Sequence, residues 1–201
     1  MGDAARLEVA AGFATHSGWA VAVVVGLADA HLQVHDRRRV ELVAPDLPRQ
    51  AYHAAADLPA SDGVEVVAAV DRSIAEHARR VLAAVRADLD RGLSLVAVGV
   101  VGRPRDIPDV ATVLASHALM HASEGEQYRR GLAEAGDELA LPVLRADPAG
   151  LEQAAADAIG WGSSHLADEH THLRSTLGPP WQRDHRHATA AALLALTKRG
   201  R

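Results

Sequence analysis

The chain has 201 residues, a formal net charge of −5 with its histidines neutral, and no cysteine. The lack of thiols excludes disulfides, thiolate zinc sites and a cysteine nucleophile. Aromatic residues make up only 3% of the chain although 48% is hydrophobic, so the core must be built from Ala, Val and Leu. The acidic balance weighs against a protein that holds duplex DNA by its phosphates, because such proteins normally present a basic face.

The sequence contains no pattern that points to a membrane. No apolar run approaches the roughly 20 residues needed to cross a bilayer. The opening segment, MGDAARLEVA, lacks the basic and apolar regions of a signal peptide. We therefore expect a cytoplasmic protein with no membrane contact. The usage rich in Ala, Arg and Val is typical of a GC-rich, actinobacterial genome.

The first part of the chain predicts an antiparallel meander of three strands. Residues 8–15 are short and apolar, residues 16–18 form a tight turn, and residues 19–26 are rich in β-forming side chains. Two strands joined by so short a turn must form a hairpin. Residues 31–43 offer a third strand whose centre is polar on both faces, which is typical of an exposed edge. Edge strands can serve dimerisation, although charges there usually discourage it.

The middle of the chain predicts helices that alternate with two further strands. A helix is expected over residues 64–89. It is followed by an apolar strand over residues 93–101, of the kind buried on both faces in a parallel sheet. A second helix is expected over residues 110–139, with a bend near residues 123–125, and then a short strand over residues 141–145.

Three more helices are expected at the C-terminal end. They cover residues 150–159, residues 164–177 and a last stretch through residues 188–197, for which Asp184 is the expected N-cap. The Gly and Pro residues between these stretches mark the turns that separate them.

This order predicts an α/β fold with a three-stranded antiparallel meander followed by β-α units. The strands are expected to form a mixed sheet with helices packed on it. No linker divides the chain. We therefore expect a single domain over residues 1–201, with a C-terminal helical segment at 149–199.

Four local patterns add to the order of the elements. They are Ser17-Gly18-Trp19-Ala20 entering the second strand, the buried strand at residues 95–101, the helix from Glu124-Gly125-Glu126 with Leu141-Pro142-Val143 after it, and the final helix at residues 187–196. Over residues 8–147 and 178–198, the chain resembles the ribonuclease H-like fold. Within that fold it is similar to the RuvC-type Holliday junction resolvases.

Nucleases of that family hold two divalent cations with carboxylates. The resemblance places these carboxylates at residues 11–13 of the first strand, near Gly99 or Val100, and near His187 and Ala190. None of these positions carries an acid. A single imidazole at His187 cannot replace the set, because hard cations prefer oxygen ligands. We therefore do not expect a metal-dependent nuclease, and whether another enzymatic activity survives stays open.

Twelve histidines are a high count for this length, and their spacing points to a metal. His117, His121 and Glu124 lie at i, i+4 and i+7, on one face of the expected helix. Two imidazoles and a carboxylate can bind zinc or another transition metal, so a divalent metal is the candidate cofactor. The spacing recurs on a later helix at His165, Glu169 and His172. The alternative is that a histidine-rich chain produces such pairs by chance.

Six further candidates are expected to border the cleft in which the family has its active site. They are Thr15, His16 and Ser17 in the first turn, Arg103 after the central strand, and Asp184 and His187 at the start of the last helix. Related folds contact phosphate at the first turn. The polar groups nearest to the missing carboxylates are therefore imidazoles and hydroxyls.

Three functions remain open from the sequence. The favoured one is a degenerate, non-catalytic binding or interaction module that meets a protein partner or a second copy of itself. The second is a metal-dependent hydrolase of a phosphorylated or nucleotide substrate, in which the cleft candidates join His117 and His121 in one site. The third is structure-specific nucleic-acid binding without cleavage, which the charge does not favour and which requires the scattered basic residues to gather on one face.

Overall fold

The first three strands form the predicted meander. The computed structural model describes residues 6–29 and 31–198. β1 (Leu7–His16) pairs antiparallel with β2 (Trp19–Ala28), and β2 pairs antiparallel with β3 (His31–Glu41). The first turn is tight because Gly18 has a φ of 89°, a conformation that other residues rarely adopt. The meander expected from the sequence is confirmed.

Two parallel strands complete a mixed sheet. β4 (Leu93–Val101) lies parallel to β1, and β5 (Val143–Ala146) lies parallel to β4. The order across the sheet is β3-β2-β1-β4-β5. β3 therefore forms one edge, and β4 lies between two neighbours, as its apolar sequence predicts. The meander, the β-α units that follow it and this strand order confirm the expected ribonuclease H-like α/β fold.

Four helices pack together on one side of the sheet. They are α1 (Ala51–Ala56), α2 (Ala60–Ala87), α3 (Val110–Leu114) and α4 (His117–Glu138). Their buried side chains share a core with Phe13 and with the other residues that β1 turns toward this face. A period of two along β1 sends its neighbouring residues to the opposite face.

The break in the second helical region lies earlier than the predicted bend. α3 ends at Leu114 and α4 begins at His117, whereas residues 123–125 lie inside α4. Ser116 caps α4 by accepting a hydrogen bond from the Leu119 amide at 3.4 Å. Residues 123–125, where a bend was expected, lie inside one continuous helix, and Ser123 and Glu124 are buried there.

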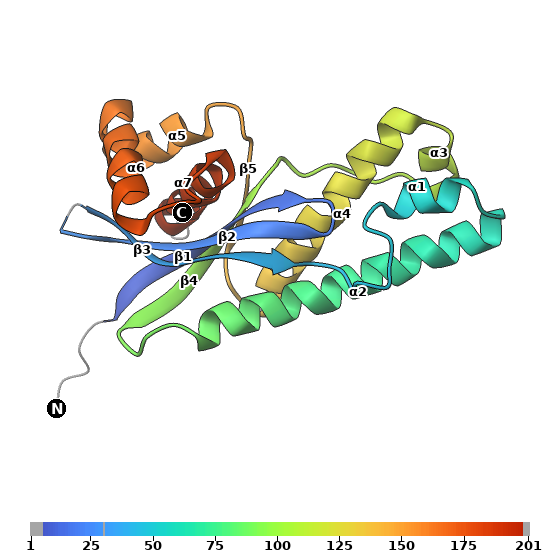
Figure 1. Ribbon diagram of the computed structural model, residues 1–201, viewed down its shortest axis with the longest axis horizontal. Coiled ribbons are helices and arrows are strands. Elements are labelled where there is room, and N and C mark those ends of the chain that lie inside the picture. Colours follow the sequence, from blue (N-terminus) through green and yellow to red (C-terminus); the bar gives the residue numbers. More distant parts are fainter. Residues whose placement is uncertain (1–5, 30, 199–201) are drawn as a thin grey trace.

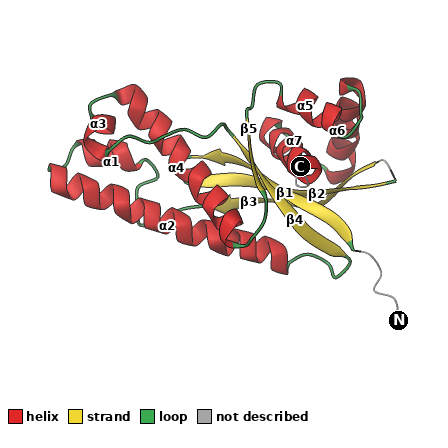
Figure 2. Ribbon diagram, turned by 180° about the vertical axis from the view of Figure 1, so that it is seen from behind, coloured by secondary structure: helices red, strands yellow, loops and turns green. Residues whose placement is uncertain are grey.

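The opposite face carries the three C-terminal helices (Figures 1 and 2). They are α5 (Leu151–Ala158), α6 (Ser163–Leu177) and α7 (Arg183–Lys198). α7 begins earlier than predicted, so Asp184 lies in its first turn instead of preceding it. α7 ends at the last residue described, and residue 199 of the expected helical segment lies outside the described residues.

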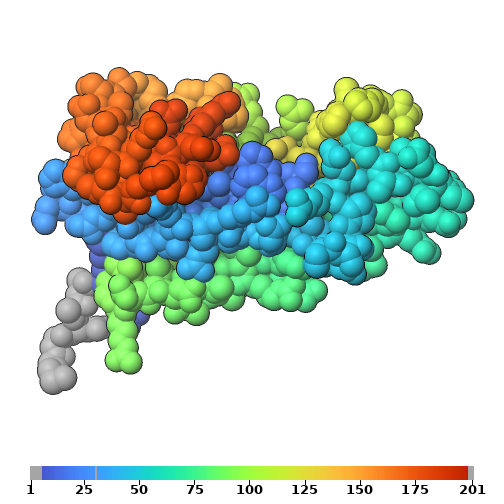
Figure 3. Space-filling view, in the orientation of Figure 1, coloured from blue at the N-terminus to red at the C-terminus, as the bar shows by residue number. Residues whose placement is uncertain are grey.

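The two groups of helices give the molecule two distinct ends. α1 and α3, with the adjoining ends of α2 and α4, extend past the strands, at the far end of the molecule from α5, α6 and α7 (Figures 1 and 3). Within the described part of the chain, no helix has both the length and the apolar character that crossing a membrane requires.

Candidate functional site

Close packing between α7 and the sheet fills the space beside the residues at which the resemblance leads one to expect carboxylates. A Cβ atom built on Gly12 of β1 would lie 1.8 Å from the carbonyl oxygen of Ala188. One built on Gly99 of β4 would lie 2.2 Å from the carbonyl oxygen of Ala191. Both distances are far below van der Waals contact. The backbone of α7 therefore rests directly on the backbones of the two central strands.

This packing does not fit the two divalent cations that the fold family implies. Of the positions expected to hold carboxylates, Ala11, Phe13 and Val100 belong to the core on the other face of the sheet. Ala190 of α7 is fully buried. At Gly12, the carbonyl of the packed helix takes the space that a side chain would need. The residues at these positions supply neither the oxygen ligands nor the room for the pair of cations.

The first-turn candidates meet one residue of α7. His16 donates a hydrogen bond from Nε2 to Asp184 Oδ2 at 2.9 Å, and its ring stacks on Trp19 with the centroids 4.1 Å apart. Thr15 is half-buried and Ser17 is exposed beside this pair. Because both partners of the ion pair are well exposed, it contributes at most about 1 kcal/mol.

The other two cleft candidates have different partners. Arg103 forms an ion pair with Asp147, just after β5. His187 has its Nε2 atom 3.9 Å from Glu152 Oε1, and burial, reinforced by the charge of Arg183, lowers the pKa of this histidine. Four of the six candidates are therefore divided among three separate polar contacts.

The structure does not join these residues to His117 and His121. α4 packs into the core that contains Phe13, whereas α7 packs into the core that contains Ala10 and Ala14. The sheet lies between the two helices. The residues expected to form one hydrolase cleft therefore lie on opposite faces of the sheet, because consecutive residues of β1 point to opposite faces.

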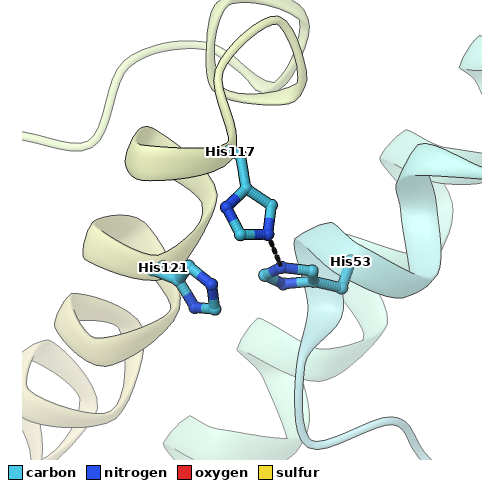
Figure 4. Close-up of side chains that lie close together, drawn as sticks. All are labelled: His53, His117 and His121. Atoms are coloured by element: carbon cyan, nitrogen blue, oxygen red, sulfur yellow. Dashed lines mark hydrogen bonds between the residues drawn. The ribbon is translucent and has the colours of Figure 1, made fainter.

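His117 and His121 meet a third histidine instead. His53 of α1 faces them across the gap between α1 and α4 (Figure 4). One ring nitrogen from each of the three lies within 4.8 Å of the others. The Nε2 atoms of His53 and His117 are 3.4 Å apart, and the ring centroid of His121 lies 4.5 Å from each of the other two. His53 is half-buried and the other two are exposed, so the cluster is open to solvent.

Glu124 lies behind this cluster rather than in it. Its side chain is only 2% exposed. Its Oε1 atom accepts a hydrogen bond from His53 Nδ1 at 2.8 Å and another from the His53 amide at 3.1 Å. An ionised carboxylate only accepts, so Nδ1 carries the proton and the lone pair of His53 lies on Nε2, facing the other two histidines. A carboxylate that orients a ligand histidine in this way is a common companion of protein-bound zinc.

Sequence spacing found two members of this cluster and missed the third. His117 and His121 share a helical face, which the period of α4 guarantees. His53 lies in a different helix, and nothing in its flanking residues relates it to α4. The signal available was only the high histidine count. The contact arises because α1 packs against α4, which no local pattern encodes.

The second histidine group does not assemble. Glu169 accepts hydrogen bonds from His31 Nδ1 and from the Leu32 amide, both at 3.3 Å. His165 Nε2 lies 3.8 Å from Glu169 Oε1, and the His165 ring stacks on Trp161. Among the described residues, the cluster of His53, His117 and His121 is the one group of three or more side chains whose ligand atoms lie close enough to hold a metal ion.

The chain is similar to solved structures of low sequence identity. No protein-family model and no curated protein matches the chain. Two solved structures of RuvC from Thermus thermophilus are similar to it, one of them in complex with a Holliday junction substrate. The sequence identities are 17% and 18%, and each comparison covers 92% of this chain and 90% of the other with a TM-score of 0.49. The assignment of the fold rests on the order and directions of the strands.

Proposed function

We propose that this chain is a ribonuclease H-like binding module without two-metal nuclease chemistry, and that it binds one transition-metal ion through His53, His117 and His121. The observation that carries the proposal is the 3.4 Å separation of the His53 and His117 Nε2 atoms. Two nitrogens bound to a tetrahedral zinc ion lie about 3.3 Å apart. A small rotation of the exposed His121 ring completes the set.

The chemistry of the donors selects the metal. Imidazole nitrogens suit Zn²⁺, Cu²⁺ and Ni²⁺, whereas Mg²⁺ and Ca²⁺ prefer oxygen. The three nitrogens must be unprotonated to bind, and Glu124 supports this state at His53 by holding its Nδ1 proton. Glu124 also places a carboxylate next to the site, which favours a bound cation.

A bound ion would join two separate parts of the helical end. His53 comes from α1, a helix of only 6 residues, and the other two ligands come from the first turns of α4. An ion held by both helices stabilises the folded chain, because the unfolded chain does not hold the three ligands together. This supports a role for the metal in fixing the surface formed by α1 and α4 for a partner.

Hydrolysis is the second candidate, and the open side of the cluster favours it. Three protein ligands with a free fourth position are typical of catalytic zinc sites, whereas structural sites use four. The exposure of His117 and His121 leaves that position accessible. The binding module remains the favoured proposal, because the three ligands join two separate helices.

The proposal is tested by calorimetric titration of tag-free protein with ZnCl₂ and, separately, with MgCl₂. We expect one zinc site per chain and no response to magnesium. His117→Ala and His121→Ala should abolish zinc binding. His172→Ala, which removes an exposed histidine of α6, should leave it intact. The absence of zinc binding, or an equal loss in the His172→Ala control, would refute the proposal.

Two further measurements separate the alternatives. Glu124→Gln keeps the shape of the side chain and should weaken zinc binding by about 10–100-fold, since it alters the group that orients a ligand. Zinc-loaded protein is then assayed with bis(p-nitrophenyl) phosphate, a general phosphodiester substrate. Turnover that disappears in His121→Ala favours the hydrolase, and no turnover favours the binding module.

A further inference from the structure

A second candidate site lies at the opposite end of the molecule, between α6 and α7. A cavity of about 410 Å³ opens there. Its polar lining consists mainly of His170, Arg174, Trp181, Gln182, Arg183 and Arg186. We call these six residues and the space between them the α6–α7 pocket. Its size lies in the range of small-molecule sites. His170 and Arg174 come from the part of the chain that the family resemblance does not cover, and the other four residues come from the start of α7 and the turn before it.

Two buried side chains of the α6–α7 pocket lack hydrogen-bond partners. His170 is 4% exposed, and neither of its ring nitrogens makes a hydrogen bond. The nearest carboxylate oxygen, from Glu152, is 4.0 Å from its Nε2. Trp181 is 5% exposed, and its Nε1–H also has no acceptor. Buried polar groups are normally hydrogen-bonded, so two unpaired groups in one cavity indicate a ligand that accepts hydrogen bonds.

The charged side chains that line the pocket are all basic, and Glu152 lies outside the lining. The three arginines line it, and no acidic side chain does. Arg186 has one long contact, 3.7 Å from its Nε to Glu152 Oε1. Arg174 and Arg183 have neither an ion pair nor a side-chain hydrogen bond with any described residue. Guanidinium groups that are free to bind suit phosphate oxygens, which they can contact in pairs.

The turn beside the pocket is anchored by a contact from the edge strand. Arg37 of β3 donates hydrogen bonds to the carbonyl oxygens of Leu177, Gly178 and Pro180, at 2.6, 2.8 and 2.8 Å. These carbonyls form the turn between α6 and α7. The turn therefore has a fixed shape, and a ligand does not have to order it on binding.

We propose that the α6–α7 pocket binds a small phosphate monoester. Arg174 and Arg183 contact the phosphate oxygens from the open side, and His170 and Trp181 donate to the ligand from the buried side. Burial lowers the pKa of His170 to about 4, so near neutral pH its imidazole acts as an uncharged donor and the arginines supply the charge. A small ligand fits better than a nucleic-acid strand, because the donors converge on one half-enclosed cavity while the chain as a whole carries a net charge of −5.

The test is calorimetric titration of the full chain with AMP, inorganic phosphate and adenosine, with EDTA present so that the histidine cluster is metal-free. We expect AMP and phosphate to bind and compete for one site, and adenosine not to bind. Arg174→Gln and Arg183→Gln should each weaken AMP binding by about tenfold or more. Arg72→Gln, which removes an exposed arginine of α2, should not.

The arginines are exposed, so their variants should keep the stability of the wild type, which circular dichroism checks. In NMR, the His170 ring resonances should shift when phosphate is added to the wild type and not to Arg174→Gln. The proposal is overturned by any of three results: no binding of AMP or phosphate, equal effects of Arg72→Gln and Arg174→Gln, or a single-stranded oligonucleotide that binds this pocket more tightly than AMP does.

Discussion

Replacing Gly12 by alanine tests whether the backbone of α7 rests directly on β1. The added Cβ would lie 1.8 Å from the Ala188 carbonyl oxygen, whereas ordinary contact begins near 3.4 Å. The helix backbone must therefore withdraw by about 1.6 Å. Overpacking against movable side chains costs about 1–3 kcal/mol, and here the obstacle is backbone. Withdrawal of α7 would also open voids beside its buried alanines, so we expect a loss of about 3 kcal/mol or more.

The assay is urea-induced and thermal unfolding followed by circular dichroism. For a chain of this size, a loss of 3 kcal/mol lowers the Tm by about 6–12 °C. Gly92→Ala is the matched control, because a Cβ at Gly92 would meet no atom within 4 Å. It should be neutral or stabilise the chain by up to about 1 kcal/mol. If Gly12→Ala is within about 1 kcal/mol of Gly92→Ala, the direct contact of α7 with β1 does not exist.

Three other predictions concern the metal cluster, the buried histidine and a buried ion pair. Zinc at 100 times its dissociation constant should stabilise the wild type by about 2.7 kcal/mol and raise its Tm by about 5–11 °C, and should not change the Tm of His117→Ala. Burial first, and then the charge of Arg186, lowers the pKa of His170 from 6.5 to about 4, while Glu169 opposes the shift. The unfolded chain therefore binds this proton more tightly, so the stability that depends on neutral His170 is complete above pH 6.5 and is lost as the pH falls toward 4. In urea unfolding, this group should lower the free energy of unfolding by roughly 3 kcal/mol between pH 6.5 and pH 4. His170→Gln should make the free energy of unfolding less dependent on pH over this range. An unchanged pH dependence in His170→Gln would contradict the assignment. Glu126→Gln should cost about 3–5 kcal/mol in unfolding free energy, because it removes the buried carboxylate that pairs with Arg145, whose side chain is 11% exposed. The exposed Glu134→Gln should cost less than about 1 kcal/mol.

The strands were predictable because their determinants are local. Residues 16–18 allow only a tight hairpin, and the apolar run at residues 93–101 fits only a strand with neighbours on both sides. The helix break at Ser116 was not predicted, since Gly125 has the stronger local tendency to interrupt a helix. Packing of α4 against α2 overrides that tendency, and the cap at Ser116 sets the boundary instead.

The candidate cleft failed for a related reason. Asp184 and His187 are close in sequence, and both lie in the first turns of α7. Their side chains nevertheless contact different elements, Asp184 the first turn and His187 a residue of α5. The faces that a helix presents follow from its period, but the partners of each face depend on how the helix is placed on the sheet.

The sequence by itself determined the strand order of the meander, the lack of carboxylates at the family's metal positions, and the shared face of His117 and His121. These depend on residue identity and on the periods of strands and helices. Only the tertiary structure decided that His53 completes the cluster and that Gly12 lets α7 rest on β1. Both are contacts between segments far apart in the chain, and no local pattern specifies them because they arise when whole helices are packed on opposite faces of the sheet.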